Sequence, residues 1–92
     1  MHAIVTRVHI EAGHFDEARK ALQDAVIPRV QAAPGFVTGH WLEPVDGRGL
    51  SVVVFETEEA ARRTAGMLEV GSHPSQFVTV ESVEVREVVG HA

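Results

Sequence analysis

The order in which the hydrophobic periodicity changes along the chain limits the fold more than any other feature. In residues 3–11 (AIVTRVHIE) every second residue shares a face, which is the period of a β-strand. From His14 onward, apolar residues recur every three or four positions, which is the period of an amphipathic helix. The same criteria predict strands at residues 3–11, 36–43, 50–56 and about 77–89, and helices at about 14–32 and 57–69.

The order β-α-β-β-α-β predicts a ferredoxin-like α+β sandwich. With right-handed crossovers, these elements close into a four-stranded antiparallel sheet that carries both helices on one face. Residues 50–56 (LSVVVFE) are apolar on both faces, which is typical of a central strand. No repeat or internal linker interrupts the pattern, so we expect residues 1–92 to form a single domain.

One loop and one proline mark two of the expected boundaries. Residues 44–49 (PVDGRG) predict a hairpin connection, because glycine supplies the positive φ that tight turns require. Pro28 lies inside the first helical pattern, where a proline removes a hydrogen-bond donor. We therefore expect this helix to kink or break near residues 25–27.

The helix-free face of the sheet is predicted to be apolar. Val5, Val37, Trp41, Val52 and Val54 fall on this face when each strand alternates regularly. An exposed apolar sheet face needs a cover. A second copy of the same face is the simplest one, so the pattern predicts a homodimer in which two sheets form an α+β barrel.

Composition excludes several classes of partner. The chain has no cysteine, which favours a reducing, cytoplasmic setting over a disulfide-stapled extracellular one. We expect no signal peptide and no membrane span, because no apolar run approaches the necessary length. The formal charge is −5 and the basic residues are scattered, so a nucleic-acid partner is not expected.

The candidate site residues are those predicted to line a space between sheet and helices. His40 shares its predicted face with Thr38 and is a candidate general base, since imidazole titrates near neutral pH; the alternative is a hydrogen-bonded, half-buried histidine. His73 is the second catalytic candidate, on a loop where a cavity could open, or else an ordinary loop residue. Thr6, Thr38 and Phe55 are candidate ligand-binding residues, with core packing as the alternative for Thr6 and Phe55.

No pattern of metal or cofactor chemistry is present. The six histidines form no HExxH or similar ligand motif, and there is no cysteine, so no metal site is predicted. The chain also lacks a dinucleotide fingerprint and a phosphate loop, and we expect no cofactor.

Three segments resemble landmarks of the antibiotic-biosynthesis-monooxygenase-like domains. They are residues 5–13 (VTRVHIEAG), residues 33–36 (APGF) and residues 52–61 (VVVFETEEAA). The resemblance implies a homodimeric α+β barrel with a cavity in each subunit between sheet and helices. Some members oxidise polycyclic phenols with O₂ and no cofactor, others degrade heme, and others have no known activity.

The heme-degrading branch of that family provides a check at three positions. It uses an Asn in the first strand, a Trp at the end of the third strand and a His after the second helix. The matching positions here are Thr6, Phe55 and about Val80, so all three differ. The resemblance therefore does not imply heme degradation, because valine cannot ligate iron.

Two functions remain open at this point. The first is a cofactor-independent monooxygenase that acts on a small aromatic or polyketide-like molecule. The alternative is a non-enzymatic homodimer of the same fold that binds a small molecule without converting it. The residues do not decide whether the chain is an enzyme. A third possibility is a structural dimer whose cavity is filled by large side chains, namely Phe15, Phe36, Phe55 and Phe77.

Overall fold

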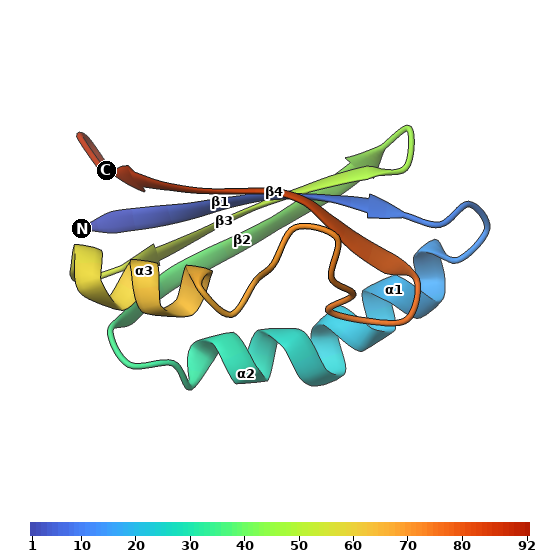
Figure 1. Cartoon of the computed structure of the whole chain (residues 1–92), viewed down its shortest axis with the longest axis horizontal. Coiled ribbons are helices and arrows are strands. Elements are labelled where there is room, and N and C mark those ends of the chain that lie inside the picture. The colour runs from blue at the N-terminus through green and yellow to red at the C-terminus, as the bar shows by residue number, and fades with distance from the viewer.

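The computed structural model describes all residues 1–92 and has the predicted order of elements. Figure 1 shows one sheet with every helix on the same side. The elements are β1 (His2–Ile10), α1 (Phe15–Ala21), the π-helical turn η1 (Leu22–Val26), α2 (Ile27–Gln31), β2 (Phe36–Val45), β3 (Arg48–Phe55), α3 (Glu58–Ala65) and β4 (Val78–Glu87).

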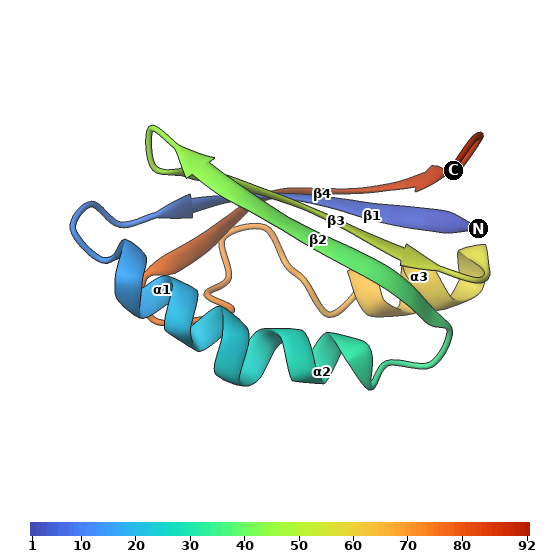
Figure 2. The ribbon, with the colours of Figure 1, turned by 180° about the vertical axis from the view of Figure 1, so that it is seen from behind.

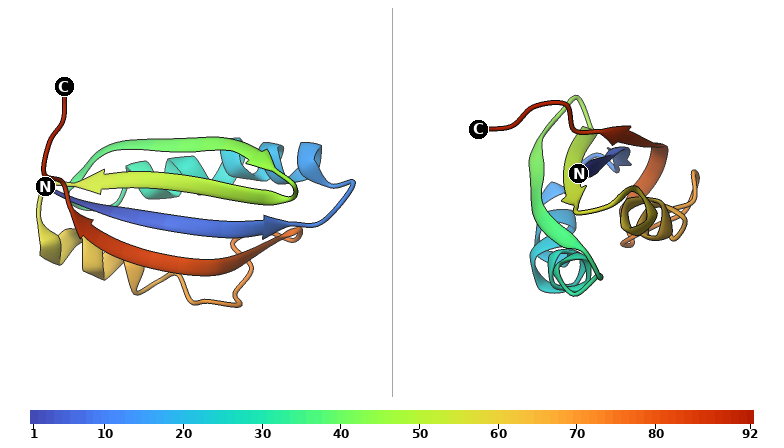
Figure 3. Two further views of the ribbon diagram at one scale, coloured as in Figure 1. Left: turned by 90° about the horizontal axis from the view of Figure 1, so that it is seen from above. Right: turned by 90° about the vertical axis from the view of Figure 1, so that its left-hand side faces the viewer.

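The sheet is antiparallel throughout and has the order β2-β3-β1-β4, which confirms the ferredoxin-like fold. The strands lie side by side in this order in the left-hand view of Figure 3. β3, the strand that is apolar on both faces, is central as predicted. None of the helices has the length and apolar character needed to cross a membrane.

The β2–β3 connection is tighter than predicted. Val45 pairs with Arg48, so only Asp46 and Gly47 form the loop. Both have positive φ, at 53° and 75°, which is the conformation of a two-residue type I′ hairpin turn. The predicted loop covered residues 44–49. Of these, residues 44–45 belong to β2 and residues 48–49 belong to β3.

The first helical segment bends without breaking. Pro28 has no N–H to donate to the carbonyl of Asp24, so the α-helical ladder cannot continue through this position. The backbone responds with a π-helical turn, in which the N–H of Ile27 donates to the carbonyl of Leu22. The helix then resumes as α2 and ends at Gln31, close to the predicted end.

The closed core lies at one end of the molecule, under α3. Thr57 caps this helix, because its hydroxyl accepts a 3.1 Å hydrogen bond from the Ala60 N–H. Ala60 and Ala61 are small enough for α3 to approach the sheet closely, directly over Phe55. α3 ends at Ala65, earlier than the predicted residue 69. The buried cluster consists of Ile4, Val53, Phe55, Ala60 and Ala61.

The long segment α1–η1–α2 lies farther from the sheet than α3 does. Figure 2 and the end-on view of Figure 3 show it passing below the sheet, with a gap that α3 does not leave. Among its residues only Ala18 is buried. The sheet under this segment therefore has no tightly packed helical cover.

Candidate functional site

A cavity of about 700 Å³ occupies the space between α1–η1–α2 and the sheet. Its wall on the helix side includes Leu22, Val26 and Val30. Its floor is formed by the helix-facing residues of the strands, among them Thr6 and Val80. Most of the lining is apolar, and the volume lies within the range of small-molecule sites. The cavity is thus a direct consequence of the helix that lies away from the sheet.

A β-bulge in β2 determines which residues reach this cavity. Phe36 pairs with Phe55, but the next partner of β3, Val54, is opposite Thr38 and not Val37. Two residues of β2 therefore oppose one of β3, and the side chains beyond this point exchange faces. A further irregularity follows between Leu42 and Val45.

The bulge overturns two of the predicted site positions. Thr38 and His40 pair with Val54 and Val52 and lie exposed on the helix-free face, not on the helix-covered face. The prediction assumed regular alternation from Phe36 onward, and one extra residue invalidates it. His40 therefore cannot act as a base inside this cavity.

The same bulge turns Trp41 to the helix-covered face and into the cavity. Trp41 pairs with Ser51, lines the cavity and packs against the core cluster, so its predicted place on the helix-free face is wrong. A local sign of this was present in Gly39, because a glycine inside a strand also marks a place where another group approaches closely, and here that group is the Trp41 indole.

The other predicted residues divide between the cavity and its surroundings. Thr6 is only 6 % exposed and lines the cavity. Phe55 is fully buried in the core and does not line the cavity, contrary to its prediction as a ligand-binding residue. His73 is exposed and absent from the lining; its ring Nδ1 lies 3.1 Å from the Val78 carbonyl and 3.3 Å from the Thr79 hydroxyl. Its neighbour Pro74 does line the cavity.

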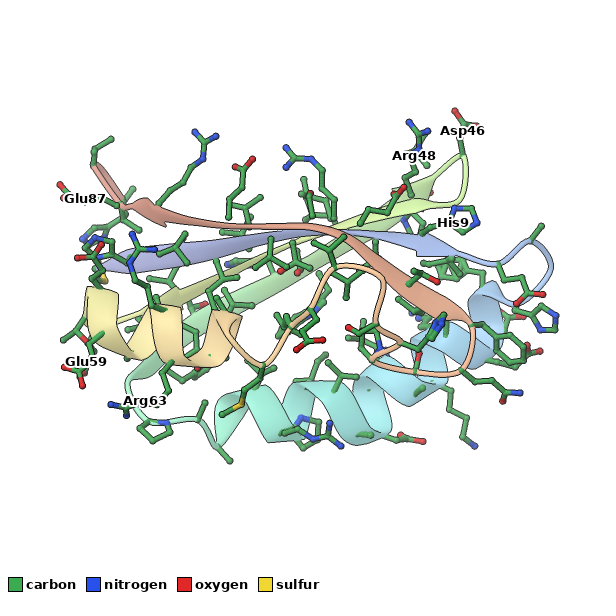
Figure 4. The ribbon with its side chains drawn as sticks, viewed as in Figure 1. His9, Asp46, Arg48, Glu59, Arg63 and Glu87 are labelled. Carbon is green, nitrogen blue, oxygen red and sulfur yellow. The ribbon has the colours of Figure 1, made fainter.

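The cavity lining contains few ionisable side chains. Arg19 on α1 and Glu43 on β2 are the charged residues among those that line it, and no histidine lines it. No group of three or more histidine, cysteine or acidic residues is placed to hold a metal ion. Other charges lie outside: Arg48 and Asp46 point away from the helices at the hairpin, and Glu59 and Arg63 pair on the outer side of α3 (Figure 4).

Gly39 controls the position of the Trp41 indole. A Cβ atom at residue 39 would lie 2.8 Å from two carbons of the six-membered ring, closer than such atoms approach. We expect Gly39→Ala to displace the indole, change Trp41 fluorescence and lower the free energy of unfolding by about 1–3 kcal/mol. Gly90→Ala is the control, because a methyl group at residue 90 would meet no atom within 4 Å. An unchanged emission spectrum for Gly39→Ala would contradict this packing.

The fold is shared with proteins of known structure. No protein-family model and no curated protein matches the chain. Among solved structures, the heme-degrader MhuD from Mycobacterium tuberculosis with two hemes bound in its active site matches with a TM-score of 0.75 and 24 % identity, covering 100 % of this chain and 99 % of that one. A mutant of MhuD with two manganese protoporphyrin IX molecules per active site matches with the same TM-score and identity, covering 100 % and 98 %. The chain therefore has the ferredoxin-like fold found in MhuD.

Proposed function

We propose that this chain binds a small, mostly apolar aromatic molecule in the cavity beneath α1–η1–α2. The observation that supports this most is the size and lining of the space, about 700 Å³ and mainly apolar, in a domain of only 92 residues. A chain this small has little core to stabilise it, and an apolar ligand that covers these walls would remove them from water, which favours binding. An aromatic ring suits a space bounded by a flat sheet and an indole.

Binding without conversion is better supported than oxygenation. Cofactor-independent oxygenation of a phenol begins with its deprotonation, which requires a base at the ligand. His40 lies on the other face of the sheet and His73 lies outside the lining. Glu43 is the one carboxylate on the lining, so it is the residue to test if oxygenation occurs. The monooxygenase is therefore our second candidate.

Heme is not the ligand that this lining favours. MhuD is a heme-degrader, but the lining here offers no histidine, cysteine, methionine or tyrosine to hold the iron. Thr6 and Val80, two of the three positions compared with the heme-degrading branch, do line the cavity. Their side chains cannot replace the amide and imidazole of that branch.

Ligand binding can be tested by filling the cavity. 9-Fluorenone, a flat aromatic ketone, is expected to quench Trp41 fluorescence in a saturable titration. Val26 lines the cavity and its neighbour Ala25 is exposed and does not. We expect Val26→Phe to weaken fluorenone binding by about tenfold or more, since the added ring occupies the same space. Ala25→Phe should bind like the parent chain. Equal binding by both variants would place the ligand elsewhere.

Oxygenation has its own measurement. Oxygen uptake by the protein on anthrone- and hydroquinone-type phenols, without added cofactor or metal, would exceed the autoxidation rate if the chain were a monooxygenase. In that case Glu43→Gln should reduce the uptake. We expect uptake at the autoxidation rate, together with binding, which would separate the two candidates.

We also propose that the chain functions as a homodimer through its helix-free face. Val5, Val52 and Val54 lie on this face by their pairing and do not line the cavity, whereas Leu42 and Leu50, which share their register, do line it. The hydroxyl oxygen of Ser82, on the same face, is buried without a partner. A second copy would cover the apolar centre of the face. Trp41 is not part of this interface, since it faces the cavity.

A further inference from the structure

We propose that Thr6, Ser51 and Trp41 form a polar row that hydrogen-bonds an oxygen atom on the edge of the aromatic ligand. The inference rests on the proposed function and specifies the class of ligand, an aromatic ketone or phenol in place of a plain hydrocarbon. The row is defined by strand pairing: Thr6 is opposite Ser51, and Ser51 is opposite Trp41.

The pairing places the three side chains on neighbouring strands of the cavity floor. They belong to β1, β3 and β2, which are adjacent in the sheet, and all three line the cavity. Side chains directly opposite each other in an antiparallel pair have Cβ atoms about 4.5–5.5 Å apart. The Cβ atoms of the three residues therefore cross the floor at a single level, so one ligand oxygen placed between Thr6 and Ser51 lies within reach of both hydroxyls.

On β1 and β3, apolar residues and one glycine flank the row on both sides. Ile4 and Val8 precede and follow Thr6 on its face of β1, and Val53 and Gly49 flank Ser51 on β3. On β1 and β3 a ligand lying on this floor meets no polar side chain except those of the row, and the one charged side chain that β2 adds to the lining is Glu43, beyond Trp41. The position of a polar atom on the ligand would thus determine how the ligand lies.

The chemistry of the row suits a neutral oxygen. Each hydroxyl can donate one hydrogen bond and accept others, whereas the indole N–H can only donate. None of these three side chains takes part in the side-chain hydrogen bonds of the structure. A hydrocarbon would cover these groups without pairing them, and a ketone would pair them, so the row discriminates between the two.

The test compares 9-fluorenone with fluorene, which has the same three rings and lacks the carbonyl oxygen. Each competes with 1-anilinonaphthalene-8-sulfonate for the cavity, and the ratio of the two affinities is measured. We expect the parent chain to prefer fluorenone beyond the difference in their hydrophobicity. Thr6→Val and Ser51→Ala should each reduce that ratio about threefold to tenfold, because each removes one hydroxyl.

Two controls keep the test specific. Thr6→Ser retains the hydroxyl and should retain the ratio, which separates hydrogen bonding from packing at this buried position. Thr64→Val removes a hydroxyl that lines the same cavity from α3, outside the row, and should leave the ratio unchanged. If Thr6→Val and Ser51→Ala leave the ratio unchanged while both probes still bind, the proposed polar row is wrong and the proposed binding function of the cavity still stands. Failure of the parent chain to bind either probe would overturn the cavity function as well.

Discussion

Phe55→Ala is expected to lower the free energy of unfolding by about 3–5 kcal/mol. Phe55 is fully buried and packs edge-to-face on Phe36, with ring centroids 6.3 Å apart. Its neighbours Ala60 and Ala61 belong to a capped helix, so they cannot collapse fully into the space left by the ring. Small domains are stable by only about 5–15 kcal/mol, so this loss is a large part of the total.

The measurement is chemical denaturation followed by circular dichroism, with Phe15→Ala as the matched control. Phe15 is 40 % exposed, so the same truncation should cost much less. Both substitutions remove the same phenyl ring, so the difference between their losses of stability reports the burial of Phe55. A loss below about 1 kcal/mol for Phe55→Ala would mean that the core is not centred under α3.

The architecture could be predicted because each element has a distinct hydrophobic period. The period-two strands and the helix spacing do not depend on distant contacts, and the acidic start of α3 after Thr57 is a local signal. The predicted ends of two elements were less accurate. The hairpin loop is shorter than predicted, because Asp46 adopts the positive φ of a two-residue turn. The helix expected to reach residue 69 ends at Ala65, directly before Gly66.

The site was less predictable because side-chain direction depends on register. Thr6 precedes any irregularity on its strand and was placed correctly on the cavity floor. His40, Thr38 and Trp41 follow the β2 bulge, so all three were assigned to the wrong face. A single extra residue reverses every later side chain, and no local periodicity in such a short strand reveals it. Gly39 was the one local indication.

The existence of an open cavity depends on packing that no sequence pattern specifies. Of the four phenylalanines that could have filled it, only Phe15 lines the cavity. Phe36 and Phe55 contact each other in the region of the core, and Phe77 stacks on His14 at 3.8 Å between ring centroids. The π-helical turn before Pro28 belongs to the segment that lies away from the sheet, and such turns are frequent at functional sites.

Val52→Asp is expected to convert the proposed homodimer to a monomer. Val52 is half-buried at the centre of the helix-free face, paired with Val5 on one side and His40 on the other. A two-fold contact over this face would take two new carboxylates out of water, and His40 opposite each, with Arg7 on the same face, would offset only part of that cost. At roughly 1.5 kcal/mol net for each carboxylate, the dissociation constant should rise by about two orders of magnitude.

Light scattering on a size-exclusion column measures this change directly at micromolar protein concentration. Val45→Asp is the control, because Val45 is a 67 % exposed valine beside the hairpin turn, away from the centre of the face. It should keep the mass of the parent chain. Circular dichroism of Val52→Asp should remain that of a folded domain, since the substituted side chain faces away from the core. A parent chain that is already monomeric, or a Val52→Asp variant that remains dimeric, would show that the two-fold contact does not use this face.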